Sequence, residues 1–132
     1  MQDRLSFEEL LLIAEATLGV PYDDLERTVC VFRAESALAA PFARLRGTDL
    51  HPDPVERATI CATRVIRGRP FLFGNQEVGY ECMREMVART PDCRWMRQDE
   101  EARDVEATLK RLEVGTMGES EFLRWARRRV KA

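Results

Sequence analysis

Histidine is almost absent from the sequence, and cysteine is scarce and never closely paired. The 132 residues include one histidine, His51, and four cysteines at positions 30, 61, 82 and 93. No C-x-x-C pair is present, and a zinc site needs several nitrogen or sulfur ligands in register. We therefore expect no metal site and little histidine-based catalysis, with His51 exposed in a proline-rich loop. Cys61 and Cys82 fall on apolar faces of expected helices, which favours buried thiols that act as small hydrophobic side chains.

Long apolar runs are missing too, and neither sign of charge dominates. No stretch of about 18 apolar residues is available for a transmembrane helix. Residues 1–9 lack the apolar stretch and cleavage site of a signal peptide. The 21 Lys and Arg are balanced by 23 Asp and Glu, for a formal net charge of -2, which argues against nucleic acid or an anionic membrane as a partner. We expect a cytoplasmic protein that binds neither.

The remaining composition is that of an ordinary globular protein. Hydrophobic residues make up 45% of the chain, which argues against disorder. At roughly 100–200 residues per domain, residues 1–132 predict one domain, and that length is enough to bury a substantial core. The sequence contains no internal repeat, low-complexity segment or linker.

Apolar residues at helical spacing, punctuated by glycine and proline, predict an all-α fold. Ser6 and Glu9 form the pattern of a capping box, Gly19 ends the helix that follows, and Pro41 ends or kinks a later helix. The expected helices lie between residues 6 and 19, 23 and 27 (a short helix or turn), 33 and 45, 54 and 68, 78 and 90, 99 and 115 (capped by Asp99), and 118 and 130. Residues 28–32 are compatible with a short strand, and residues 93–95 with a short extended piece. We expect a compact bundle of about six helices with little or no sheet.

A loop rich in proline and glycine, Arg69–Glu77, joins two of the most apolar expected helices. Gly74 and Asn75 tolerate unusual backbone angles, and they lie where the first free amide groups of the second helix are expected. Such a helix start can bind an anion, because its unpaired N–H groups and its dipole favour negative charge. A plain connection between two helices explains the same residues, so both interpretations remain open at this point.

The loop resembles the signature motif of the Fic/Doc (Fido) family, whose pattern is roughly H-P-F-x-[DE]-G-N-[GK]-R-x-x-R. Pro70, Phe71, Gly74 and Asn75 stand at matching positions. The resemblance implies the Fic/Doc fold and a loop that binds a ligand. It also implies an ATP- and Mg²⁺-dependent transfer of phosphate or AMP to a protein hydroxyl.

Two further segments are similar to Doc-like members of this family. Residues 33–41, R-A-E-S-A-L-A-A-P, resemble an early helix often written E-S-A-L-x-x-P, and residues 109–125 resemble the C-terminal helix pair. The resemblance therefore covers residues 5–130, and the small size of the chain also matches Doc. Doc-like proteins commonly pair with a small antitoxin, so the resemblance implies an antitoxin or another peptide as a partner in the groove.

The residues that differ from the motif stand mostly at the positions that carry out its chemistry. Arg69 stands at the position of the family's histidine base, and arginine stays protonated at any relevant pH. Phe73 replaces the acidic residue that helps to hold Mg²⁺, and a phenyl ring offers no oxygen ligand. Gln76 stands at the glycine or lysine position, Glu77 replaces an arginine that binds phosphate, and Tyr80 replaces the second arginine. Phosphoryl transfer depends on positioning and charge stabilisation, and these substitutions remove most of the charged groups.

Three interpretations follow. The first is a degenerate Doc-like protein that has lost the transfer reaction, needs no cofactor and keeps a binding groove. The second is an enzyme with altered chemistry, in which Arg69 binds an anion and Glu77 acts as acid or base, with Cys82 or Tyr80 as further candidates. The third is an active toxin that uses ATP and Mg²⁺ despite the substitutions.

The candidate site is the same in each interpretation. Its candidate catalytic residues are Arg69 and Glu77, and no residue is expected to bind metal. Arg69 either binds an anion or donates hydrogen bonds to nearby carbonyls, and Asn75 either contacts a ligand or caps the following helix. The remaining residues of the candidate ligand-binding loop are Pro70, Phe71, Phe73, Gly74, Asn75 and Gln76.

Overall fold

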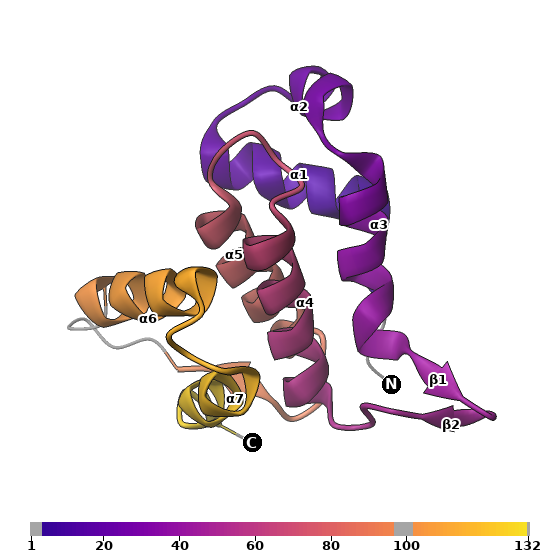
Figure 1. The fold of residues 1–132 in the computed structure, drawn as a ribbon, viewed down its shortest axis with the longest axis vertical. Helices are drawn as coiled ribbons and strands as arrows, with labels where there is room; N and C mark the ends of the chain where they lie inside the picture. The colour runs from indigo at the N-terminus through magenta and orange to yellow at the C-terminus, as the bar shows by residue number, and fades with distance from the viewer. Residues whose placement is uncertain (1–3, 97–101, 132) are drawn as a thin grey trace.

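The structure, a computed structural model, describes residues 4–96 and 102–131. Its described elements are seven α-helices, one 3-10 turn and two small antiparallel sheets (Figure 1). They are α1 (Phe7–Leu18), α2 (Tyr22–Thr28), α3 (Val31–Ala39), the 3-10 turn η1 (Ala40–Phe42), β1 (Arg44–Leu45), β2 (Thr48–Asp49), α4 (Pro54–Gly68), α5 (Asn75–Ala88), β3 (Arg94–Trp95), α6 (Ala102–Val114), α7 (Glu119–Arg127) and β4 (Val130–Lys131). The prediction of a mostly helical fold with little sheet is confirmed. None of the described helices is long and apolar enough to cross a membrane.

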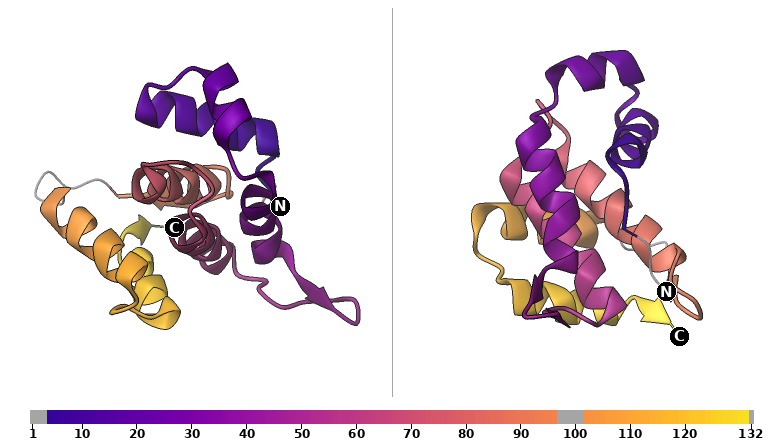
Figure 2. Two further views of the ribbon diagram at one scale, coloured as in Figure 1. Left: turned by 45° about the horizontal axis from the view of Figure 1, so that its top comes forward. Right: turned by 90° about the vertical axis from the view of Figure 1, so that its right-hand side faces the viewer.

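The centre of the fold is the pair of helices α4 and α5. Both present buried apolar faces to one another, and Gly79 of α5 lies against Ile66 and the Ala62 carbonyl of α4. Helices α1 and α3 pack on this pair from one side, and α6 and α7 pack from the other (Figures 1 and 2). The loop that joins α4 to α5 is therefore held at one end of the two most central helices.

The C-terminal elements are tied to the centre by an aromatic cluster. Trp95 contacts Tyr80 edge-to-face and donates a hydrogen bond from Nε1 to the Tyr80 hydroxyl (3.1 Å). Trp125 stacks on Phe122, with 5.6 Å between ring centroids, and its Nε1 donates to Asp104 of α6. Both tryptophans thus pack among the C-terminal elements and α5.

The start of α1 shows how local sequence sets a helix boundary. The Ser6 hydroxyl accepts a hydrogen bond from the Glu9 amide (3.0 Å), and the Glu9 carboxylate accepts one from the Ser6 amide (2.9 Å). This is the capping box that the sequence predicts. Gly19 ends the helix in the left-handed conformation, also as predicted. Glu9 also pairs with Arg89 at the end of α5, so the same carboxylate ties the two helices together.

The Glu9–Arg89 pair makes stability depend on pH. The hydrogen bond from Arg89 and the one from the Ser6 amide lower the pKa of Glu9 from 4.5 to about 2. The ionised carboxylate therefore stabilises the fold above pH 4.5, and this stabilisation is lost as the pH falls towards 2. We expect Glu9→Gln to cost up to about 1 kcal/mol at neutral pH, since both side chains are partly exposed. Urea midpoints of the two proteins should converge as the pH approaches 2; a gap that is constant with pH would contradict the ion pair.

Several predicted boundaries are wrong. Residues 28–32 form no strand, because α2 runs to Thr28, whose hydroxyl bonds back to the Asp24 carbonyl, and α3 begins at Val31. The helix expected up to residue 45 ends at Ala39, and a β1–β2 hairpin follows. The prediction that Pro41 ends or kinks this helix is confirmed, since proline lacks the N–H needed to continue it.

The C-terminal boundary is corrected in the same way. The last helix ends at Arg127 instead of Val130, because Val130 pairs with Trp95 in the small sheet of β3 and β4. The extended piece expected at residues 93–95 is present as β3. The predicted helix cap, Asp99, lies outside the described residues.

Candidate functional site

The loop between α4 and α5 is built by two residues in the left-handed backbone conformation. Arg69 ends α4 with φ 52°, and Gly74 precedes α5 with φ 75°. A Cβ atom at Gly74 would lie 2.2 Å from Cδ2 of Leu18, so a larger residue here would have a strained dihedral angle and would displace the Leu18 side chain. The Pro70 carbonyl accepts a hydrogen bond from the Cys30 amide (2.8 Å). The loop is therefore fixed against the end of α1 and against the junction of α2 and α3.

Asn75 holds the loop from inside. Its side chain is buried, accepts a hydrogen bond from the Phe71 amide (3.0 Å) and donates one to the Phe71 carbonyl (2.9 Å). The cap residue of α5 is Gly74, and no side chain caps this helix. Asn75 therefore does not act as the helix cap that the sequence allowed, because its amide group is used by the Phe71 backbone.

The two candidate catalytic residues lie at opposite ends of the loop and form no ion pair with each other. Arg69 and Glu77 are both exposed, and neither side chain has a hydrogen-bond or ion-pair partner among the described residues. Glu77 is the third residue of α5, where a carboxylate interacts favourably with the helix dipole. Gln76 donates a hydrogen bond to Glu113 of α6 (3.1 Å). The structure thus gives Gln76 a bridging contact and leaves Arg69 and Glu77 facing solvent.

An apolar cavity of about 190 Å³ opens beside the loop, and we call it the loop groove. Phe71 is buried at its base, whereas Leu72 and Phe73 are 72% and 58% exposed. The residues that line the loop groove come from α1, α2 and the loop: Leu18, Val20, Asp24, Leu25, Thr28, Phe71, Leu72 and Phe73. The sequence placed Phe71 and Phe73 in the site, but it did not single out Leu72 or the walls, which come from segments about 50 residues earlier.

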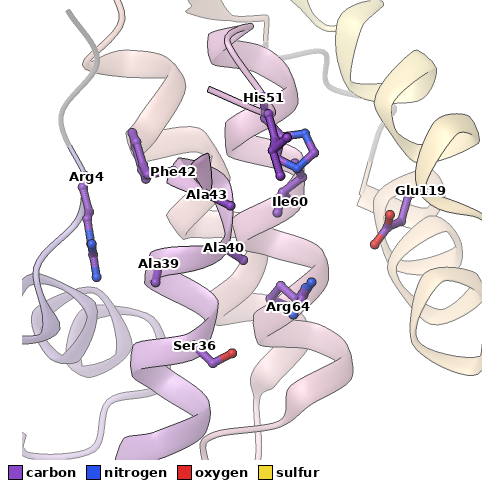
Figure 3. A pocket seen from close by; sticks show the side chains of 11 residues that line it. Arg4, Ser36, Ala39, Ala40, Phe42, Ala43, His51, Ile60, Arg64 and Glu119 are labelled. Carbon is purple, nitrogen blue, oxygen red and sulfur yellow. The ribbon is translucent and has the colours of Figure 1, made fainter. Parts of the chain in front are cut away.

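A second and larger cavity, of about 600 Å³, lies against α3 and α4 and shares no lining residue with the loop groove (Figure 3). We call it the α3–α4 cavity. Its lining residues are Arg4, Ser36, Ala39, Ala40, Phe42, Ala43, Leu50, His51, Ile60, Arg64 and Glu119. Sequence reasoning missed this cavity. The available signal was the series of small residues at 36, 39, 40 and 43, which removes volume from one face of α3 and its continuation.

Two of the four cysteines are buried, and His51, which the sequence suggested would be exposed, is partly buried. Cys61 and Cys82 are buried between α4 and α5. The pKa of the Cys82 thiol is raised well above its ordinary value by its hydrogen bond with Cys61 and by burial, which argues against Cys82 as a nucleophile. His51 is partly buried and its Nδ1 bonds to Glu56 (2.9 Å). No three His, Cys, Asp or Glu side chains gather into a possible metal site within residues 4–96 and 102–131.

No protein-family model matches this sequence, and no curated protein or solved structure is significantly similar to the chain. The likeness to the Fic/Doc family therefore depends on the motif residues of the chain itself, chiefly Pro70, Phe71, Gly74 and Asn75.

Proposed function

We propose that this chain is a degenerate Doc-like protein with a Fic/Doc-type helical fold. In this proposal it has lost the ATP-dependent transfer of phosphate or AMP to protein hydroxyls. It retains the loop groove as a binding site for a peptide segment of a partner, such as a small antitoxin. The observation that carries the proposal is the combination of a rigidly held motif loop with side chains that are unsuited to the transfer chemistry.

Two loop residues that match the family motif have defined roles in the backbone of the loop. Gly74 adopts a dihedral angle that favours glycine and lies against Leu18, and Asn75 satisfies both polar groups of the Phe71 backbone. Residues that match the family motif thus help to fix the shape of the loop.

The residues that differ from the motif remove its chemistry. The guanidinium of Arg69 cannot accept a proton from an attacking hydroxyl. Phe73 has no oxygen for a metal ion. Glu77 places a carboxylate within the first turn of α5, where it opposes a phosphate at the free amides of the helix start. Phe73 and Glu77 therefore disfavour bound Mg²⁺ and ATP, whereas Arg69 removes the base that the transfer reaction needs.

The surface beside the loop favours a protein partner. Leu72 and Phe73 expose large apolar side chains at the mouth of the loop groove, and its walls are mostly apolar. Exposed apolar patches of this kind mark interaction sites in folded proteins. The residues that line the loop groove include no basic side chain to pair with a triphosphate, and the carboxylate of Asp24 among them would repel one. An apolar peptide side chain therefore fits the groove better than a triphosphate.

The loss of nucleotide binding has a direct test. A ligand at a hundred times its Kd stabilises a protein by about 2.7 kcal/mol, which gives a clear rise in melting temperature. We expect no rise with ATP and Mg²⁺, and no transfer of label from radioactive ATP to proteins of a cell lysate.

We expect binding to appear in the triple variant Arg69→His, Phe73→Asp, Glu77→Arg, which restores three motif residues. Metal-dependent ATP binding by the unchanged chain would contradict the proposal, and labelling would establish the active toxin. If the protein is instead an enzyme with altered chemistry in which Glu77 acts as acid or base, Glu77→Gln should abolish its measurable turnover.

The position of the partner site can be tested with a matched pair of residues. Phe73 and Val114 are both 58% exposed, but only Phe73 lines the loop groove. A photo-cross-linking amino acid placed at position 73 should capture a discrete partner from the native cytosol, whereas the same group at position 114 should not. Equal capture at the two positions would place the partner elsewhere on the chain.

A further inference from the structure

The α3–α4 cavity combines polar and apolar walls in one hollow. Ile60 and Arg64 of α4 form one wall, Ser36 of α3 another, and His51 closes one end. Figure 3 shows Arg64 and Ser36 on neighbouring helices beside the same hollow, with the carboxylate of Glu119 directed towards it from α7. The cavity volume of about 600 Å³ lies within the usual range for small-molecule sites.

The cations of this cavity are not used by the fold. Neither the Arg64 nor the Arg4 side chain forms an ion pair or hydrogen bond with the part of the chain that the structure describes. By contrast, the nearby His51 is held by Glu56 through Nδ1. Glu119 is the one carboxylate in the lining, so the lining carries two arginines against one acid. The cavity therefore has a net positive charge and a guanidinium whose donors are free for a ligand.

We propose that the α3–α4 cavity binds a small organic carboxylate with an apolar body. The guanidinium of Arg64 presents two parallel N–H donors, a geometry that matches a carboxylate. The Ser36 hydroxyl lies on the adjacent wall and supplies a further donor to the same group. Arg4 lines the far side of the cavity, beyond α3 in Figure 3, and adds positive potential without sharing the contact.

The other residues that line the cavity favour a ligand with an apolar body and a single negative charge. Phe42, Leu50 and Ile60 offer apolar surface, and the alanines of α3 and η1 leave room beside it. Glu119 repels a second negative charge, so a monoanion is favoured over a dianion such as a phosphate monoester. This site is separate from the loop groove and does not depend on the function proposed for that groove.

The test uses benzoate as the probe, with benzyl alcohol as its neutral analogue and inorganic phosphate as the competing anion. Each is titrated into the full-length protein, and amide chemical shifts are followed by NMR. We expect benzoate to shift the amides of α3 and α4 in a saturable manner, with clearly weaker binding of benzyl alcohol and phosphate. Arg64→Gln should weaken benzoate by about tenfold or more, as expected for the loss of a charged hydrogen bond, and Ser36→Ala should weaken it by a smaller factor.

Arg103→Gln is the matched control, because Arg103 is also an exposed arginine without a partner among the described residues but lies on α6, outside the cavity. It should leave benzoate affinity within about twofold of the unchanged protein, since exposed charges act weakly at a distance. Equal affinities of the Arg64 and Arg103 variants would overturn the proposal. Equal binding of benzyl alcohol, tighter binding of phosphate, or no shift at about 20 mM benzoate, a concentration that suits a fragment of this size, would also overturn it.

Discussion

Replacing Asn75 with alanine should destabilise the protein by about 2–4 kcal/mol, because it removes two hydrogen bonds from a buried stretch of backbone. The side chain of Asn75 is 4% exposed and bonds to both the amide and the carbonyl of Phe71. Each buried polar group left without a partner costs about 1–3 kcal/mol. No other described side chain bonds to these two groups. Urea denaturation followed by circular dichroism gives the change in the free energy of unfolding.

Two variants separate this effect from a general sensitivity of the loop. Asn75→Asp keeps an acceptor for the Phe71 amide but loses the donor to the Phe71 carbonyl, so we expect a smaller loss than with alanine. Gln76→Ala removes only a partly buried contact to Glu113 and should cost less than about 1 kcal/mol. If Asn75→Ala cost no more than Gln76→Ala, the hydrogen bonds to Phe71 would not be what holds the loop.

Asn75 also shows how far the sequence predicts the site. Its type and position between Gly74 and the apolar helix mark it as a residue of interest, because glycine and asparagine signal unusual backbone geometry. Its role as a link to Phe71 depends on how five residues turn back on themselves, which no spacing rule specifies. The sequence therefore predicts the location of the loop, while its internal bonding emerges only from the three-dimensional structure.

The helices and the cavities show the same contrast between local features that the sequence predicts and tertiary features that it does not. The capping box at Ser6 is set within four residues, so the sequence predicts it correctly. The β-branched residues at 28–32 suggest a strand, but no neighbouring strand is available and helical packing prevails. The walls of the loop groove and the α3–α4 cavity come from helices far apart in the chain. Periodicity identifies the buried face of each helix, but it does not say which helix packs against that face.

The close packing of the two central helices leads to a second large effect. Gly79→Ala should lower the free energy of unfolding by about 1–3 kcal/mol, the usual cost of forcing extra atoms into a packed core. A Cβ atom at position 79 would lie 2.8 Å from Cγ1 of Ile66 and 3.0 Å from the carbonyl oxygen of Ala62. Ile66 is fully buried and the Ala62 oxygen belongs to the backbone of α4, so neither can yield unless the helices separate. Urea denaturation measures the change.

Gly68 of α4 provides the matched control, because it is also a helical glycine but a Cβ atom there would have no neighbour within 4 Å. Alanine has a higher helix propensity than glycine and restricts the unfolded chain, so Gly68→Ala should stabilise the protein by about 0.4–1 kcal/mol. Gly79→Ala gains the same helix propensity, so the predicted loss of stability requires that its steric cost exceed that gain. The two variants should therefore shift stability in opposite directions. A stabilising Gly79→Ala would mean that α4 and α5 lie further apart than the structure places them, and the loop that they hold would have a different shape.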